Sequence, residues 1–136
     1  MVTISSDKAL IDTDAVVAFL QNESYWAGHR TRDQIERSIE HSLCFSVFDD
    51  DRFVGFARVV TDQVTVSYLC DFFVLTEYQR QGIGSQALQL MMADSRLSGT
   101  LWMLFTQTAH KLYSRFGFIQ DPGMVERVMF RHRPAS

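Results

Sequence analysis

The sequence lacks the features that define several large classes of protein. It has only two cysteines and two prolines in 136 residues, so neither a disulfide framework nor a proline-rich linker is expected. Its 13 basic residues are outnumbered by 16 acidic ones, which gives no support for a nucleic-acid partner or an anionic membrane surface. No apolar run is long enough to span a bilayer, and the first seven residues show no signal-peptide pattern. We therefore expect a cytoplasmic protein with no nucleic-acid or membrane partner.

The cysteines and histidines give no sign of metal or redox chemistry. Cys44 and Cys70 both lie in apolar runs, where a free cysteine packs as a small hydrophobic side chain. Neither has a histidine or a second cysteine at the spacing of a nucleophile–base pair or a metal site. His41, His110 and His132 also lack partners at metal-ligand spacing. No metal is expected.

Hydrophobic spacing predicts two short helices near the N-terminus, after a first strand. Asp12 can cap the first helix, and Thr31 with Gln34 forms a capping box at the start of the second. An aromatic loop over residues 25–29 separates the two helices. Three strands are then expected as an antiparallel meander, over residues 43–48, 53–60 and 64–75.

The second half of the chain alternates helices and strands. We expect a helix from Gly82 to the Ser98-Gly99 pair, and then a strand over 100–105 whose apolar residues indicate burial on both faces. A short helix should end at Gly117, which suits a left-handed stop, and a last strand is expected over 124–130. The sequence thus predicts one α/β (α+β) domain over residues 1–136, with a mixed sheet, helices on both faces and the order β-α-α-β-β-β-α-β-α-β.

The segment from Gln79 to Gly84 joins a strand to a helix through two glycines. The first N–H groups of a helix have no internal partner and lie at its positive end. Gly82 and Gly84 have no Cβ to keep a phosphate away from these N–H groups. Arg80 and Gln81 add side-chain donors beside them, as does Gln79. The segment therefore predicts a phosphate or pyrophosphate site, although a tight structural turn is the simpler alternative.

Two common classes of phosphate site fit this segment poorly. A P-loop requires Gly-Lys-Ser/Thr, and no lysine follows Gly84. Gly82, Gly84 and Ala87 match the dinucleotide pattern Gly-x-Gly-x-x-Gly/Ala. However, the next strand does not end in the acidic residue that a dinucleotide site usually has about 20 positions after the glycines. The motif also comes too late in the chain to leave room for a doubly wound sheet.

In two linked blocks the chain resembles the GNAT superfamily of N-acetyltransferases. The first block, Gln/Arg-x-x-Gly-x-Gly/Ala, is matched by Gln79, Gly82 and Gly84. The second is an alanine followed by Leu/Phe-Tyr and then Gly-Phe, and it is matched by Ala109, Leu112, Tyr113, Gly117 and Phe118. The resemblance covers nearly the whole chain. It implies a GNAT-like mixed central sheet with an antiparallel N-terminal meander.

The resemblance implies acetyl-coenzyme A as acetyl donor, with no metal. The donor would lie where strands 64–75 and 100–105 splay apart, and its pantetheine arm would pair with backbone groups near Phe73, Val74 and Leu75. Its pyrophosphate would bind at the turn and the start of the helix. The residues expected to contact it are Gln79, Arg80, Gln81, Gly82, Gly84 and Ser85. The acceptor amine would attack the thioester directly, without an acyl-enzyme.

Two residues are candidates for catalysis. The resemblance implies that Tyr113 is the general acid that protonates the departing thiolate, rather than a packing residue. Asp71 lies in an apolar strand, where a carboxylate must be paired or reach a cleft. It could collect the proton of the amine, or it could serve a structural role, and both readings stay open. Asp62 and Tyr68 are weaker candidates.

The resemblance also implies that the loop between the first two helices lines the acceptor pocket. The candidates there are Tyr25, Trp26 and His29. For the two aromatic rings, packing in the core is an alternative of at least equal weight. The expected function is acetyl transfer to a primary amine of a small molecule or a protein. The net charge of −3 leans towards a cationic small amine. The alternative is a non-catalytic acyl-CoA-binding or interaction domain of the same fold. Dimers are common in this superfamily, so the resemblance also allows a homodimer.

Overall fold

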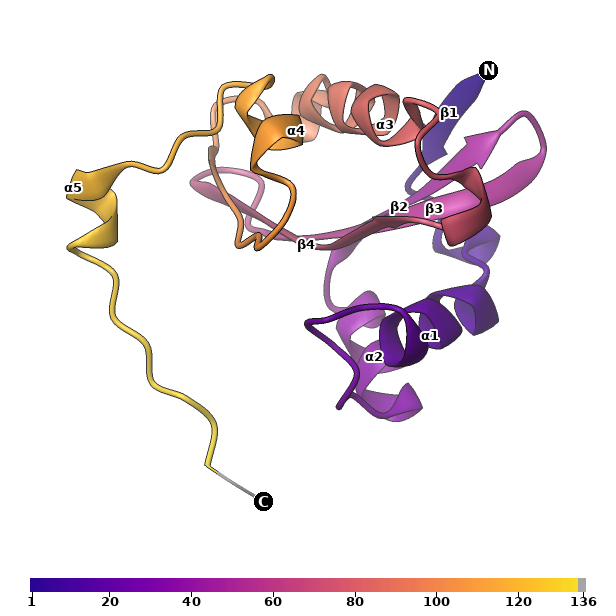
Figure 1. Cartoon of the computed structure of the whole chain (residues 1–136), viewed down its shortest axis with the longest axis horizontal. Helices are drawn as coiled ribbons and strands as arrows, with labels where there is room; N and C mark the ends of the chain where they lie inside the picture. The colour runs from indigo at the N-terminus through magenta and orange to yellow at the C-terminus, as the bar shows by residue number, and fades with distance from the viewer. Residues whose placement is uncertain (135–136) are drawn as a thin grey trace. The chain divides into compact units, whose positions relative to one another are not determined.

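The computed structural model describes residues 1–134, and the chain divides into two compact units, of which the first comprises residues 1–105. The first unit is built on a five-stranded sheet with the spatial order β1-β2-β3-β4-β5 (Figure 1). The strands are β1 (Val2–Ser5), β2 (Leu43–Asp49), β3 (Arg52–Thr61), β4 (Val66–Val74) and β5 (Leu101–Met103). The first four are antiparallel neighbours, and β5 runs parallel to β4. This mixed sheet with its meander confirms the predicted fold class.

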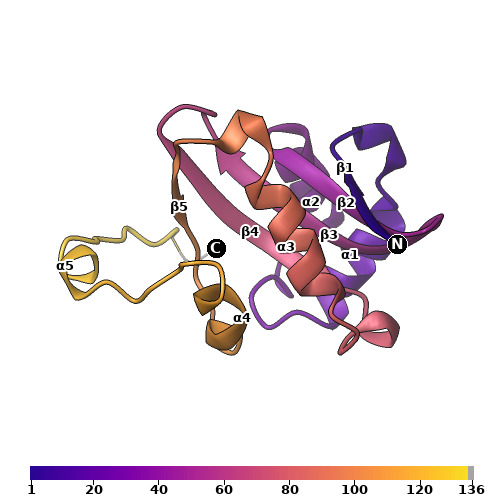
Figure 2. The same ribbon diagram turned by 90° about the horizontal axis from the view of Figure 1, so that it is seen from above.

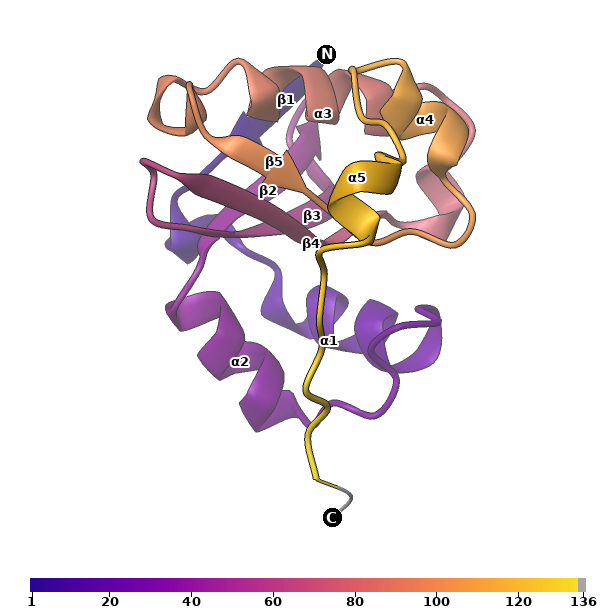
Figure 3. The ribbon, with the colours of Figure 1, turned by 90° about the vertical axis from the view of Figure 1, so that its left-hand side faces the viewer.

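Helices cover both faces of the sheet (Figure 3). The helices α1 (Thr13–Asn22) and α2 (Arg32–Glu40) lie on one face, and α3 (Ile83–Met92) crosses the other (Figure 2). Three single turns of 3-10 helix, η1 (Lys8–Leu10), η2 (Thr76–Tyr78) and η3 (Ser95–Leu97), lie in the connections. Within residues 1–134, no helix combines the length and the apolar character needed to cross a membrane.

The first two helices begin at the capping residues that the sequence predicts. The Asp12 side chain accepts a hydrogen bond from the Ala15 N–H. Thr31 Oγ1 accepts from the Gln34 N–H at 3.1 Å, and Gln34 Oε1 accepts from the Thr31 N–H at 2.9 Å. This capping box satisfies N–H groups that a helix start otherwise leaves unpaired. It also fixes the point at which the loop 23–31 enters α2.

The sheet separates two apolar cores. On one face, α1 and α2 pack on Phe56 and Phe73. On the other face, Ala87 of α3 packs on Val47 and Val54. Because side chains of successive strand residues point to opposite faces, a sheet covered on both sides needs apolar residues at almost every position. This explains the nearly continuous apolar runs of β2 and β3.

The apolar strand near residue 100 differs from its prediction. We expected burial on both faces, but β5 is an edge strand in the described sheet and Leu101 is 56% exposed. Its start is held by polar contacts: the Thr100 hydroxyl donates to the Leu97 carbonyl at 2.8 Å and lies 2.7 Å from Ser67 Oγ. Apolar composition alone does not distinguish a central strand from an edge strand, because both need β-forming residues.

The second unit begins at Thr106 and contains α4 (His110–Ser114) and α5 (Pro122–Val125) in its described part. The left-handed stop is confirmed, since Gly117 has a φ of 89°. The strand predicted over 124–130 is wrong. Asp121 caps α5 by accepting from the Gly123 N–H, and Pro122 occupies the first turn, where its fixed φ favours a helix. The single domain predicted over residues 1–136 stays a prediction.

The close approach of β3 and β4 predicts that Gly55 cannot be replaced by a residue with a Cβ without loss of stability. A Cβ at this position would lie 2.7 Å from the Phe73 carbonyl oxygen, which belongs to the backbone and cannot move independently. Gly55→Ala should therefore lower the free energy of unfolding by about 1–3 kcal/mol, measured by urea denaturation. Gly28→Ala is the matched control, because its Cβ would lie at an ordinary 3.5 Å from the nearest atom. Equal stability of the two variants would contradict the steric argument.

Candidate functional site

The strands β4 and β5 pair over only three residues. Val66, Ser67 and Tyr68 are in register with Leu101–Met103. Over residues 69–74, β4 continues beside β3, but no strand in the described chain pairs with its other edge. An unpaired edge offers backbone N–H and C=O groups to an extended ligand, as it would to an added strand. The splay of these two strands is thus present where the sequence predicted it.

The last residues of β4 differ in how far the fold already uses their backbone groups. The Leu75 N–H donates to the Val54 carbonyl at 2.8 Å, and the Leu75 carbonyl accepts from the Tyr78 N–H at 2.9 Å. The Val74 carbonyl accepts from Nε2 of Gln79 at 2.8 Å. These contacts favour the Val74 N–H over Leu75 as the partner of a bound ligand. The Phe73 carbonyl lies against Gly55 of β3, so the predicted role of Phe73 stays a prediction.

The start of α3 differs from the starts of α1 and α2. Its N-cap is Gly82, which has a left-handed φ of 79° and no side chain to cap the helix. The first hydrogen bond of the helix runs from the Gln86 N–H to the Gly82 carbonyl. The N–H groups of residues 83–85 are therefore left for an acceptor from outside the helix. A Cβ at Gly84 would lie 3.8 Å from Val74 Cγ2, an ordinary contact, so the fold alone does not require a glycine there.

The polar residues predicted beside the start of α3 differ in their contacts and in their exposure to solvent. Gln79 ties the turn to the end of β4 through its hydrogen bond to the Val74 carbonyl. Arg80 is exposed and has a φ of 64°, a left-handed conformation that is uncommon for a residue with a side chain. Gln81 is exposed and Ser85 is half-buried. Their roles in binding a phosphate stay predictions.

A β-bulge in β4 positions Asp71. Between the regular pairs on either side, β3 contributes Ala57 alone whereas β4 contributes Asp71 and Phe72. Asp71 has a φ of 49°, and a non-glycine residue held in this region costs about 1–3 kcal/mol. Such a conformation persists only where surrounding contacts hold it.

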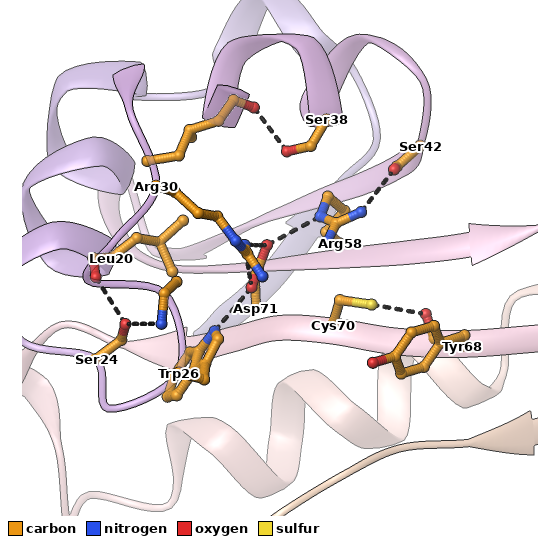
Figure 4. A network of polar contacts seen from close by, with 12 residues as sticks. Leu20, Ser24, Trp26, Arg30, Ser38, Ser42, Arg58, Tyr68, Cys70 and Asp71 are labelled. Atoms are coloured by element: carbon orange, nitrogen blue, oxygen red, sulfur yellow. Dashed lines mark hydrogen bonds and ion pairs between the residues drawn. The ribbon is translucent and has the colours of Figure 1, made fainter. Parts of the chain in front are cut away.

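Asp71 is held by three side chains from other elements (Figure 4). Nη1 of Arg30 donates to Oδ1 at 2.9 Å and to Oδ2 at 2.8 Å. Nε of Arg58, on β3, donates to Oδ2 at 2.9 Å, and Nε1 of Trp26 donates to Oδ1 at 2.8 Å. The Asp71 side chain is only 2% exposed. Because both oxygens are already engaged by strong donors, these contacts favour the structural role for Asp71 over the role of proton acceptor.

Electrostatics also count against the two weaker base candidates. Burial raises the pKa of Tyr68 to about 12, so its hydroxyl stays protonated at neutral pH. Asp62 accepts hydrogen bonds from the Thr65 hydroxyl and from backbone N–H groups of the β3–β4 turn, which hold the pKa of its carboxyl well below the usual range. Burial alone would lower the pKa of Arg58, but the charge of Asp71 and the hydrogen bond to it raise that pKa above its ordinary value.

The loop between α1 and α2 brings Trp26 into contact with Asp71, whereas Tyr25 and His29 of the same loop are exposed. Trp26 is partly buried against the core below α1 and α2. The Tyr25 ring meets the Trp26 ring edge-on at 5.0 Å and is about half exposed, and His29 is exposed. The contacts of Trp26 thus favour packing and positioning. Acceptor-binding roles for Tyr25 and His29 stay predictions.

In the second unit, the block that contains Tyr113 folds as a local motif. The Tyr113 N–H donates to the Ala109 carbonyl at 3.2 Å, and the Phe118 N–H donates to the Tyr113 carbonyl at 3.3 Å. The rings of Tyr113 and Phe118 meet edge-on with centroids 5.6 Å apart. The spacing of this block is therefore explained by packing within the unit, and the catalytic role of the hydroxyl stays a prediction.

The splayed β4–β5 pair and the glycine-started α3 belong to a fold that acetyltransferases share. Residues 13–118 match the model of the acetyltransferase (GNAT) family, and the chain belongs to that family. A candidate acetyltransferase of the GNAT family from Xanthomonas campestris pv. campestris is 37% identical, with a TM-score of 0.91 over 98% of this chain and 94% of that one.

Two further proteins are similar to this chain. A candidate acetyltransferase from Gibberella zeae is 30% identical in an alignment of 107 residues that covers 65% of this chain and only 60% of that protein's length. A GNAT family acetyltransferase from Elizabethkingia anophelis, solved with acetyl-CoA bound, shares the fold at 15% identity, with a TM-score of 0.63 over 85% of this chain and 74% of that one.

Two residues of the site, Arg30 and Arg58, were not found from the sequence. A signal for them exists, because a carboxylate in an apolar strand requires a cationic partner once it is buried. Arg58 lies on an adjacent apolar strand, and Arg30 directly follows the aromatic loop. What the sequence could not show is that the bulge would direct Asp71 to both of them.

The ion-paired carboxylate leads to a prediction about stability. Asp71→Asn would leave two largely buried guanidinium groups without a counter-charge, which should lower the free energy of unfolding by about 3 kcal/mol in urea denaturation. Asp33→Asn is the control, because Asp33 pairs with Arg37 on the exposed side of α2 and should change stability by less than about 1 kcal/mol. A fully stable Asp71→Asn variant that had lost all activity would instead support Asp71 as the base.

Proposed function

We propose that the protein transfers the acetyl group of acetyl-CoA to a primary amine of a small molecule or a protein. The observation that carries this proposal is the order of two features along the chain. The unpaired edge of β4 comes first, and the glycine-started α3 follows within a few residues. Coenzyme A has a matching order, with an amide-bearing arm followed by a pyrophosphate.

The two features supply different kinds of contact. The Val74 N–H, on the unpaired edge of β4, would pair with an amide of the arm, as with an added strand. The N–H groups of residues 83–85, at the positive end of α3, would bind the pyrophosphate. Arg80 and Gln81 would add donors beside it. Gln79 would act by holding the turn against β4, as its hydrogen bond to Val74 indicates.

The reaction needs positioning more than a reactive side chain. The amine nitrogen attacks the acetyl carbonyl carbon, the carbon–sulfur bond breaks, and the nitrogen loses a proton to water or to a base. A β4 backbone N–H would polarise the carbonyl. Tyr113 would give its proton to the departing sulfur, a role that its place in the family's second sequence block supports. Asp71 would position the site, since its oxygens are taken up by Arg30, Arg58 and Trp26.

A non-catalytic acyl-CoA-binding domain is the alternative function. Both sequence blocks are intact, with Tyr113 in the second, and a domain that only bound the coenzyme would not need its hydroxyl. An assay of thiol release from acetyl-CoA over a panel of amines separates the two functions. Binding of acetyl-CoA with no release for any amine would support the alternative.

Acetyl-CoA at about a hundredfold excess over its Kd should raise the Tm by about 5–10 °C, because a ligand that binds only the native state stabilises it. NADH and ATP at equal concentration should do much less. Gly84→Val should reduce the shift, since its side chain would obstruct the helix N–H groups. Gln89→Val places the same residue on the exposed part of α3 and should retain the shift. Equal shifts from all three ligands, or an undiminished shift in folded Gly84→Val, would contradict the pyrophosphate site.

Tyr113→Phe should lower kcat by about 10²-fold, the low end for general acid catalysis, because a thiolate is a fair leaving group unaided. The ring and its packing on Phe118 are retained, so stability and the KM for acetyl-CoA should change little. Steady-state kinetics with saturating acceptor measure this, with a burst experiment to establish that chemistry limits turnover. A kcat equal to that of the wild type under those conditions would make Tyr113 a packing residue.

A further inference from the structure

The cluster around Asp71 has more positive than negative charge. Arg30 and Arg58 each form an ion pair with Asp71, at 2.8 and 2.9 Å. Among the described residues, no second acidic side chain pairs with either arginine. The cluster of these three residues therefore retains one net positive charge in a largely buried position, where charges are screened less than in bulk water.

The donors that Asp71 does not use are not fully buried. Nε and Nη2 of Arg30 and Nη2 of Arg58 have no protein partner within residues 1–134. The only fully buried side-chain polar atom without a partner in that part of the chain is Ser46 Oγ, so these guanidinium donors are not sealed in the core. Consistent with this, the side chains of Arg30 and Arg58 are 21% and 13% exposed.

The two arginines are held in place before any ligand arrives. Nη1 of Arg58 donates to Ser42 Oγ at 3.2 Å, at the junction of α2 and β2. The Arg30 N–H donates to the Ala27 carbonyl at 3.0 Å, and the Arg30 carbonyl accepts from Nε2 of Gln21 at 3.0 Å. Because these contacts already fix the arginines, little ordering cost would remain when an anion binds.

The cluster also lies close along the strand to the proposed donor site. Asp71 precedes Val74 by three residues of β4, which is about 10 Å along a strand. The side chains of Trp26, Arg30 and Arg58 converge on Asp71 at this point (Figure 4). An acceptor whose amine approached the β4 edge could thus place a group a few bonds away against the arginines.

We propose that Arg30 and Arg58 bind a carboxylate of the acceptor, so that the substrate class is an amino acid rather than a polyamine. This inference rests on the proposed acetyl transfer. In the reaction the amine nitrogen forms the new bond to the acetyl carbon, coenzyme A leaves as its thiol, and the product is an N-acetylated amino acid. The carboxylate is bound by charge-assisted hydrogen bonds and takes no part in bond making. The proposal opposes the preference for a cationic amine that the net charge of −3 suggests.

The test compares L-amino acids with their C-terminal amides, pair by pair, in the thiol-release assay with the full chain. For the best pair, kcat/KM for the acid should exceed that for the amide by about 10- to 100-fold, the effect of a hydrogen-bonded charge pair. Arg30→Gln should bring this ratio close to one, and Arg30→Lys should keep part of it. Arg37→Gln, on the exposed side of α2, is the control and should leave the ratio unchanged. A purely structural role of Arg30 would lower both rates and leave the ratio as it was.

Other outcomes separate this proposal from the proposed function. If the wild type acetylates amides or spermidine at least as well as amino acids, the carboxylate site is overturned while acetyl transfer stands. If no amine releases thiol, acetyl transfer fails, and the site is tested by the Tm of the CoA-saturated protein. The anion site is supported if an amino acid raises the Tm more than its amide does, and if Arg30→Gln abolishes this difference. Equal Tm values overturn it.

Discussion

Around the buried carboxylate of Asp71, a strand, its neighbour and a loop depend on one another. Removing a carboxylate from water is costly unless donors replace the lost hydration. Here Arg58 donates from β3, and Arg30 and Trp26 donate from the loop between α1 and α2. The same contacts hold the left-handed backbone of Asp71, which would otherwise be strained. The bulge, the loop and the ion pairs therefore stabilise one another.

The bulge connects this interaction to the candidate donor site. It lies in the part of β4 that has already separated from β5, between the last paired residue, Tyr68, and Phe73. A bulge increases the local twist and bend of a strand, and an edge without a partner is then available to a ligand. At the end of that edge, Gln79 holds the turn that leads to Gly82 and the start of α3. The contacts expected of acetyl-CoA thus follow one another along a single continuous segment.

The helices α1, α2 and α3 differ in how the N–H groups at their starts are used. Asp12 and Thr31 cap α1 and α2 with their own side chains, which satisfies the N–H groups at those starts. The third helix begins at a glycine and leaves its first N–H groups for another acceptor. A side-chain cap on α3 would occupy the place that the proposed pyrophosphate needs.

The sequence by itself determined the features that depend on local chemistry. The caps at Asp12 and Thr31, the meander, the glycine start of α3 and the left-handed stop at Gly117 all follow from the conformational preferences of single residues or from short-range periodicity. The two sequence blocks were enough to indicate the family.

Other features were decided only by the tertiary structure. β5 proved to be an exposed edge strand, because apolar composition does not show how many neighbours a strand has. Residues 122–125 form a helical turn, capped by Asp121, where a turn followed by a strand over 124–130 was predicted. Above all, residues 30, 58 and 71 are far apart in the chain, and their meeting depends on strand register, on one bulge and on the path of a loop. No local pattern determines such a contact, because it forms only when the whole sheet and its helices are in place.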